Sequence, residues 1–228
     1  MSTLSHKHIA LLSDYEAGSA YAAAYHTLYT NISLDWDRER TCQRTILFTT
    51  PMPYPGLATA SANVAIAAAQ NGTPTILIDA NLRAPELQRL FDVAAPGGLY
   101  DLLRSQNIDA QAIDVALRAT RTPDLHLLCA GEKQPETQEL HRLFSTRLTA
   151  LLDGLRAWLQ ERESQAGLVM INGPSVLAGV EASLLSARVE QTFLIIAAGR
   201  TTRNQARRAQ EQLERARAHL AGTVLLDI

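Results

Sequence analysis

The chain has 228 residues, with 21 Lys and Arg against 23 Asp and Glu, and a net charge of −2 at pH 7. This length suits one domain with a full-sized core, and the charge balance gives no overall attraction to nucleic acid or anionic lipid. No apolar run reaches the roughly 18 residues that a membrane span needs, and Met1 to His8 lack the apolar core of a signal peptide. We therefore predict a cytoplasmic protein that binds no nucleic acid and that a partner could carry to the inner face of the membrane.

The cysteines and histidines point to no metal site. Cys42 and Cys129 lie far apart and outside any C-x-x-C pattern, and the six histidines do not cluster with them at ligand spacing. We expect two free thiols in a reducing compartment and no structural zinc.

Helix-like and strand-like segments alternate along the chain. In order, the pattern predicts a helix over 17–32, a strand over 44–50, a proline-rich loop over 51–56 and an alanine-rich helix over 57–70. A strand over 74–79, a short helix near Pro85, a break at Gly97-Gly98 before 99–103, and a strand over 125–128 follow. The remainder predicts a helix over 140–163, a strand over 166–172, a helix over 181–189, a strand over 191–198, a helix over 202–220 and a strand over 222–226.

Continuous apolar strands that alternate with helices indicate an α/β fold with a doubly wound, mostly parallel sheet and helices on both faces. We predict one domain over 1–228, with an N-terminal helical segment, 1–40, packed on it. Ligands of such sheets bind at the carboxyl ends of the strands, so the loops after Thr50, Asp79, Asn172 and Ala198 are the candidates for a site.

Several segments carry a family resemblance in register. The loop and helix from Thr50 to Gly72, the run L-I-D-A-N-L-R-A-P from Leu77 to Pro85, the run V-M-I-N-G-P from Val169 to Pro174, and the helix from Ala24 to Ile32 are similar to the motifs of bacterial tyrosine kinases. That family sits in the ParA/MinD branch of P-loop proteins. The resemblance implies a P-loop NTPase-like fold, ATP with magnesium as ligands, and a role in capsule or exopolysaccharide biosynthesis.

The chain departs from the family at the P-loop itself. Tyr54 stands at the first glycine, and Pro55, which has no N–H to donate, follows it. Leu57 stands where the family lysine reaches the phosphates, and Ala58 where a hydroxyl binds magnesium. The stretch Gly56, Leu57, Ala58 and Thr59 is therefore expected to be a vestigial P-loop.

The acidic positions have changed as well. Asp79 is kept as a vestigial metal position, but Asn81 replaces a second carboxylate and Asn172 replaces the Walker B aspartate. Glu181 stands at a nearby family aspartate, and Leu226 where the family commonly has an asparagine near the base. We expect no catalytic residues, no bound metal, and at most weak binding of ATP, ADP or magnesium. The prediction is thus a pseudoenzyme.

The N-terminal helix has lost the charged face that belongs to the family's ring-forming interface. Tyr21, Tyr25 and Tyr29 lie at helical spacing and could bury against another subunit to form a homo-oligomer. The alternative is that they pack on their own domain.

Three hypotheses compete. The first is a pseudokinase that acts by binding a chain-length-determining membrane copolymerase or an active tyrosine-kinase paralogue. The second is an active ATP-binding tyrosine kinase or ATPase with a rearranged site, in which arginines replace the lysine. The third is a ParA/MinD-like positioning protein.

Overall fold

A computed structural model describes residues 11–16, 18–34, 36, 43–94, 96–132, 135–162 and 166–227. The sheet strands within these ranges are β1 (Arg44–Thr49), β2 (Thr75–Asp79), β3 (Arg118–Ala119), β4 (Leu125–Leu128), β5 (Leu168–Asn172), β6 (Gln191–Ala197) and β7 (Leu220–Leu226). The α-helices are α1 (Ala20–Ser33), α2 (Gly56–Gln70), α3 (Leu87–Leu90), α4 (Leu99–Arg104), α5 (Ala110–Ala116), α6 (Thr137–Arg162), α7 (Glu181–Ser186) and α8 (Arg203–Arg215). Two short 3₁₀ helices, Leu12–Asp14 and Val176–Ala178, complete the list.

The strands form one sheet in the order β3-β4-β2-β5-β1-β6-β7. Every pair is parallel except β3 with β4, which is antiparallel. Strands β1, β2 and β5 lie inside the sheet and are buried at every residue but Arg44, so both of their faces are covered. The predicted fold class, a doubly wound and mostly parallel sheet, is confirmed.

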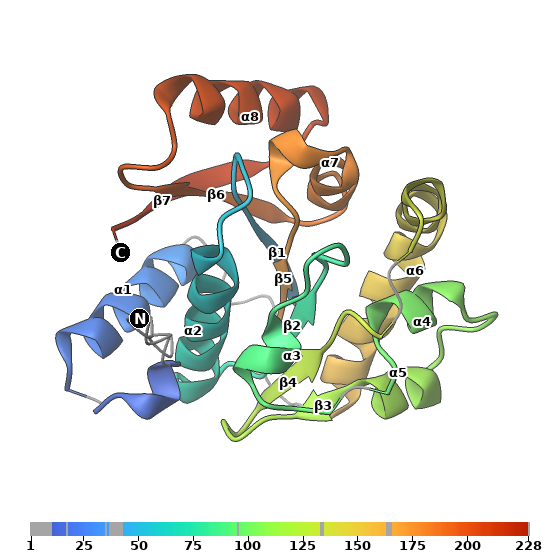
Figure 1. The fold of residues 1–228 in the computed structure, drawn as a ribbon. Coiled ribbons are helices and arrows are strands. Elements are labelled where there is room, and N and C mark those ends of the chain that lie inside the picture. Colours follow the sequence, from blue (N-terminus) through green and yellow to red (C-terminus); the bar gives the residue numbers. More distant parts are fainter. Residues whose placement is uncertain are drawn as a thin grey trace, which may run out of the picture.

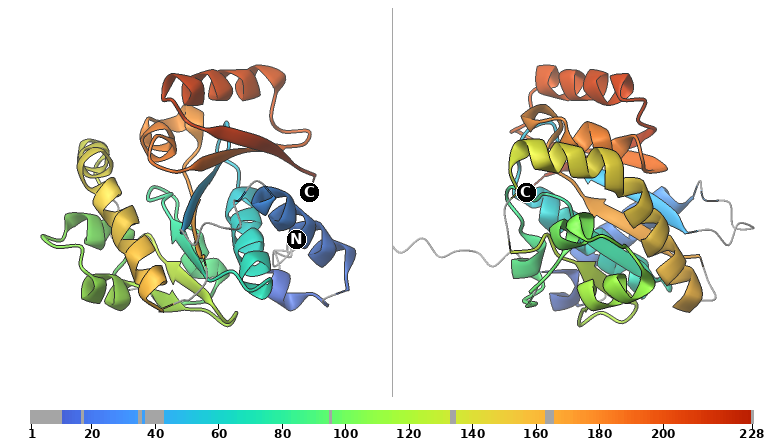
Figure 2. Two further views of the ribbon diagram at one scale, coloured as in Figure 1. Left: turned by 180° about the vertical axis from the view of Figure 1, so that it is seen from behind. Right: turned by 90° about the vertical axis from the view of Figure 1, so that its right-hand side faces the viewer.

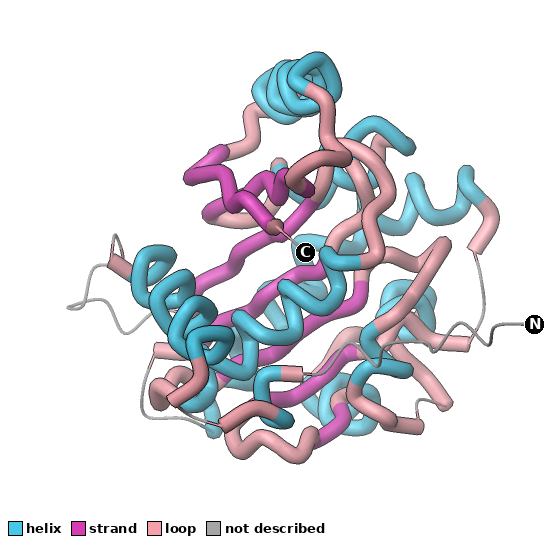
Figure 3. Tube along the Cα trace, turned by 60° about the vertical axis from the view of Figure 1, so that its left-hand side comes forward, coloured by secondary structure: helices cyan, strands magenta, loops and turns pink. Residues whose placement is uncertain are grey.

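Helices cover the two faces of this sheet as separate layers (Figures 1 and 2). Alternate side chains of β1 illustrate the division, because Ile46 and Phe48 pack with α1, α2 and α3 whereas Leu47 packs with α4, α5 and α6. Helix α8 lies with α7 over β6, through Ala209 and Leu213. The tube in Figure 3 shows the strands enclosed between these helical layers. None of the helices in the described ranges is both long and apolar enough to cross a membrane.

Helix α1 packs on α2, and this contact buries tyrosine side chains of α1. Tyr25 and Tyr29 are each only 7% exposed and belong to the core beneath α1, and Tyr21 packs against the same core. The hydroxyl of Tyr29 also shares a hydrogen bond of 2.5 Å with Oγ1 of Thr73. Tyr25 and Tyr29 therefore pack on their own domain, which is the alternative given above, whereas Tyr21 is only partly buried. A homo-oligomer through this helix stays a prediction.

A few element boundaries also differ from the predictions. Helix α5 and the two-residue strand β3 were not predicted, and residues 99–104 are helical. Helix α8 ends at Arg215 rather than at residue 220, because the chain turns through Arg217 at φ 58° before β7 begins at Leu220. Cys129 is a buried free thiol, whereas Cys42 lies outside the described residues.

Candidate functional site

The carboxyl ends of β1, β2 and β5 meet at one edge of the sheet, where a cavity of about 210 Å³ opens. It is lined from the β1–α2 loop by Thr50 and Tyr54, from the first turn of α2 by Leu57 and Ala58, and from the segments after β2 and β5 by Asn81, Arg83, Asn172, Ser175 and Glu181. The loops after Thr50, Asp79 and Asn172 thus meet at this cavity, whereas their role as a binding site stays a prediction. The loop after Ala198 does not line the cavity.

Asp79 lies at the end of β2 beneath the cavity, fully buried. Its Oδ2 accepts hydrogen bonds of 2.9 Å from the backbone N–H groups of Glu86 and Leu87. Its Oδ1 accepts hydrogen bonds from the backbone N–H of Asn81 at 3.3 Å and from Nδ2 of Asn172 at 3.1 Å. Burial raises the pKa of Asp79 to about 6, even though these hydrogen bonds lower it. Asp79 therefore anchors the start of α3 and links two strands.

The first turn of α2 packs inward. Leu57 is 5% exposed and Ala58 is 4% exposed, and both belong to the core under α1 and α2. The ring of Tyr54 lies against Gly56, where a Cβ would collide with it, and the Arg200 guanidinium lies 5.9 Å from the centre of the same ring. A tyrosine side chain thus lies against the turn where a P-loop would expose its backbone.

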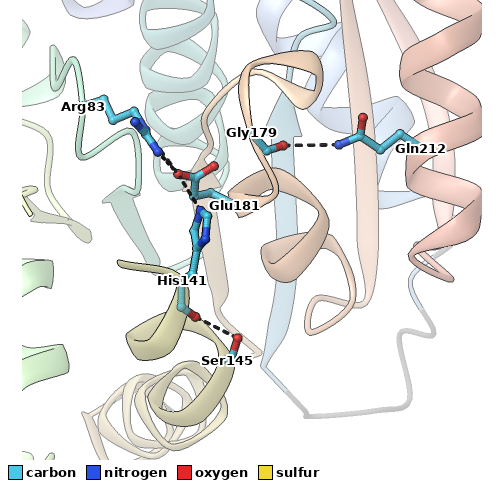
Figure 4. Close-up of polar contacts among 6 residues, drawn as sticks. All are labelled: Arg83, His141, Ser145, Gly179, Glu181 and Gln212. Carbon is cyan, nitrogen blue, oxygen red and sulfur yellow. Dashed lines mark hydrogen bonds and ion pairs between the residues drawn. The ribbon is translucent and has the colours of Figure 1, made fainter. Parts of the chain in front are cut away.

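The second carboxylate near the cavity contacts an arginine and a histidine from two other parts of the chain (Figure 4). Glu181, at the start of α7, has a side chain that is only 3% exposed. Arg83 donates from both Nε, at 3.1 Å, and Nη2 to its Oε1. His141 of α6 places Nε2 3.4 Å from the same oxygen without hydrogen-bond geometry. Burial is the largest single influence and raises the pKa of Glu181, but the hydrogen bonds from Arg83, a backbone hydrogen bond and the charge of Arg83 together lower it by more, so the net shift is downward.

The segment before α7 is fixed from the other side by α8 (Figure 4). Nε2 of Gln212 donates to the carbonyl oxygens of Val176, at 2.8 Å, and Gly179, at 3.2 Å. It also donates to Oγ of Ser183 at 3.3 Å. The rim of the cavity that carries Glu181 is therefore tied to the outer helix of the sheet.

A magnesium-bound nucleotide, the ligand that the resemblance implies, does not fit these residues. Leu57 supplies no cation and Ala58 no hydroxyl, and each oxygen of Asp79 already accepts two hydrogen bonds. The cavity volume lies below the roughly 300–1,000 Å³ of ordinary small-molecule pockets. Within the described residues, no group of three or more His, Cys, Asp or Glu side chains is placed to hold a metal ion.

The remaining predicted positions divide into two groups. Gly56 and Thr59 lie on the first turn of α2 and Leu226 at the end of β7, and none of them lines the cavity. Asn81 does, and its Nδ2 donates to the carbonyl oxygen of Ala84 at 3.0 Å. Sequence reasoning missed Arg83 and His141, although Arg83 lies inside the run from Leu77 to Pro85 that carries the family resemblance.

The fold defines the class of this protein as a kinase-like member of the P-loop α/β folds. The chain is 28% identical to the solved BceF tyrosine kinase domain, with a TM-score of 0.77 over 95% of this chain and 81% of that one. The kinase domain of the Escherichia coli tyrosine kinase ETK superposes with a TM-score of 0.81 over 95% of this chain and 79% of that one, at 19% identity, which speaks to the fold alone. MinD of Aquifex aeolicus matches more loosely, with a TM-score of 0.58 at 14% identity over 81% of this chain and 68% of that one.

Sequence similarity identifies the chain more specifically, as a homologue of bacterial tyrosine-protein kinases. Tyrosine-protein kinase YwqD of Bacillus subtilis is 27% identical over 215 residues, which are 92% of this chain and 82% of YwqD. The "Putative tyrosine-protein kinase EpsB" of Ralstonia solanacearum is 30% identical over 179 residues, which are 78% of this chain but only 22% of EpsB. No protein-family model matches the chain.

These relatives correct one expectation. The chain was expected to be a pseudoenzyme, whereas the proteins it resembles are named as tyrosine-protein kinases, which are enzymes. The inference from substituted residues to a lack of enzymatic activity is therefore overturned by the comparisons.

Proposed function

We propose that this chain is a tyrosine-kinase-like protein of capsule or exopolysaccharide biosynthesis that acts by binding other proteins of that machinery. Its partner is the membrane copolymerase that sets polymer chain length, or a tyrosine kinase of the same system. The names of its relatives support the biological setting, and their similarity spans most of the chain. The binding mode is the part that rests on the site.

The observation that carries the binding mode is that two carboxylates at the cavity, Asp79 and Glu181, already contact donors of the protein itself. Asp79 is committed to four donors, and Glu181 to Arg83 and His141. A charged ligand binds well where polar groups are available to it. Where those groups already make buried hydrogen bonds, binding must first break these bonds, and this cost weakens the affinity. Surfaces outside this cavity are the better candidates for recognition.

ATP-dependent phosphoryl transfer through a rearranged site is the second candidate function, favoured by the kinase names of the relatives. Arg83 lines the cavity and could supply the positive charge that the missing lysine would give to a phosphate. To do so, its guanidinium would have to break its hydrogen bonds with Glu181. A positioning role of the ParA/MinD kind is supported by the fold alone, and sedimentation with liposomes or DNA tests it.

Two measurements separate these candidates. Affinity purification of the tagged chain from cells of its own strain should recover the copolymerase or the kinase in fixed ratio, and a chain recovered alone would refute the binding proposal. Calorimetry with ATP and ADP, each with and without magnesium, reports on the second candidate. Magnesium-dependent binding that Arg83→Ala abolishes would favour phosphoryl transfer.

A further inference from the structure

A groove of about 660 Å³ lies between α8 and the outer strands of the sheet, away from the cavity described above. Figure 1 shows α8 above β6 and β7. Its floor comes from β6 and β7 and one wall from α8. The residues that define it are Leu194, Ile196, Leu220, Thr223, Arg203 and Arg207.

The floor of the groove is apolar and only partly covered. Leu194 is buried beneath α8, whereas Ile196 and Leu220 are partly exposed. In the β6–β7 pairing Ile196 lies beside Leu225, which is 68% exposed. Because side chains two residues apart share a face of a strand, Leu225 continues the side of β7 on which Thr223 lines the groove. An apolar strip thus extends past the helix into solvent.

The wall of the groove is positively charged. Arg203 and Arg207 lie one turn apart on α8, and no Asp or Glu lines the groove. Arg207 has an exposed side chain whose contact with Glu211 is loose, at 3.7 Å. Arg203 makes no hydrogen bond or ion pair with any residue in the described ranges. Arg203 is therefore free to meet a carboxylate, and Arg207, whose Nη2 also donates to Oδ1 of Asn204 at 3.5 Å, makes only long contacts.

The groove also borders an open sheet edge. Strand β7 is last in the strand order, and within the described chain no strand pairs with its outer side. An edge strand presents unpaired N–H and C=O groups to which an extended peptide can add. A segment added there would lie beside Leu225 and within reach of the α8 arginines.

We propose that this groove and the β7 edge dock an extended segment of another protein that carries aliphatic and acidic side chains on one face. The aliphatic side chains cover Ile196 and Leu225, and the carboxylates pair with Arg203 and Arg207. The charge of the wall and the apolar floor select this chemistry over a basic or a purely polar segment. The inference rests on the proposed binding function and names the surface that performs it.

The test uses synthetic peptides of about eight residues, the length of an ordinary strand, with Leu and Glu on one face, and fluorescence anisotropy on the intact chain. The expected result is saturable binding that weakens about tenfold or more in Arg203→Glu/Arg207→Glu, and also in Leu225→Ser. Arg208→Glu is the matched control for Arg207→Glu alone, because each reverses one exposed charge on α8 and, of the two, only Arg207 lines the groove; Arg208→Glu should leave the affinity unchanged. Thermal unfolding of each variant verifies that the chain remains folded.

Several outcomes would overturn the proposal: no binding of the acidic peptide, equal binding of a peptide with Lys in place of Glu, or equal loss in Arg208→Glu. So would occupation of the groove by a second copy of the chain, seen as self-association that Leu225→Ser abolishes, or by anionic vesicles. Affinity purification distinguishes this failure from that of the proposed function. If Arg203→Glu/Arg207→Glu still recovers the cellular partner, binding stands and the groove is the wrong surface.

Discussion

Asn172 donates a hydrogen bond of 3.1 Å from Nδ2 to Oδ1 of Asp79, and this bond joins the ends of two neighbouring strands, β5 and β2. The amide at position 172 also accepts a hydrogen bond from Ser61 of α2 at 3.2 Å. A residue that stands where the family has a metal-associated aspartate here holds strand ends and a helix together.

Asn172→Asp should destabilise the protein at neutral pH, because it sets a second buried carboxylate beside Asp79 and removes the donor between them. Like charges at this distance cannot both ionise without a large cost, so the loss should shrink as the pH falls and one of them takes up a proton. Urea unfolding at pH 7 and pH 5 measures the difference. Equal destabilisation at both pH values would show that repulsion is not its cause.

The raised pKa of Asp79 predicts a pH dependence of stability. Because its folded-state pKa of about 6 lies above the ordinary 3.8, the folded protein binds this proton more tightly than the unfolded chain does. The contribution is fully present below pH 3.8 and is lost as the pH rises through about 6. Unfolding free energies between pH 4 and pH 7 should record this fall, and Asp79→Asn should flatten it. If the unfolding free energy of Asp79→Asn fell by the same amount over this pH range, the pH dependence would come from other groups.

Gly98 and Gly97 offer a matched pair of substitutions in the segment before α4. A Cβ at Gly98 would collide with backbone atoms of Cys129, Ala130 and Gly131, which cannot move aside as a side chain can. A Cβ at Gly97 would meet only Asp101, at an ordinary 3.8 Å. We expect Gly98→Ala to cost about 1–3 kcal/mol of unfolding free energy and Gly97→Ala less than about 0.5 kcal/mol. Similar effects of the two would contradict this packing.

Arg83 and Glu181 should be energetically coupled. Arg83→Ala leaves a buried carboxylate with only His141 nearby and should cost about 1–3 kcal/mol. In a double-mutant cycle with Glu181→Gln, the double variant should lose less than the sum of the single variants, by about 1 kcal/mol. Additive losses would mean that the contact contributes nothing.

Arg89→Ala is the control for that cycle. Arg89 pairs with Glu86 at 4.0 Å while 77% of its side chain is exposed, and an exposed pair of this kind contributes little. Its removal should change the unfolding free energy by less than about 0.5 kcal/mol.

The fold was largely predictable because its strands are continuous apolar runs and its long helices are rich in alanine or leucine, so the element types follow from composition. The same reasoning placed Asp79 and Asn172 at one edge of the sheet. Helix α5 was not predicted. An aspartate is a favoured N-cap residue, so Asp109 was the sequence signal for its start, and its side chain indeed accepts a hydrogen bond from the N–H of Ala112 at 2.8 Å.

Other features depend on the tertiary fold. Strand β3 has two residues and exists only through its pairing with β4. The ion pair of Arg83 with Glu181 joins residues 98 positions apart. Tyr25 and Tyr29 of α1 are buried because they pack against α2. Helical spacing alone does not say which partner buries that face.

The most direct test of the central claim measures the binding of this chain to the cytoplasmic part of its own strain's copolymerase, and to that strain's tyrosine kinase. Calorimetry is performed in the presence and absence of magnesium and ATP. We expect specific binding to one of them, at the same affinity with and without nucleotide, because Asp79 and Glu181 at the cavity already accept hydrogen bonds from the protein's own groups. No binding to either protein, or binding that appears only with magnesium and ATP, would contradict it.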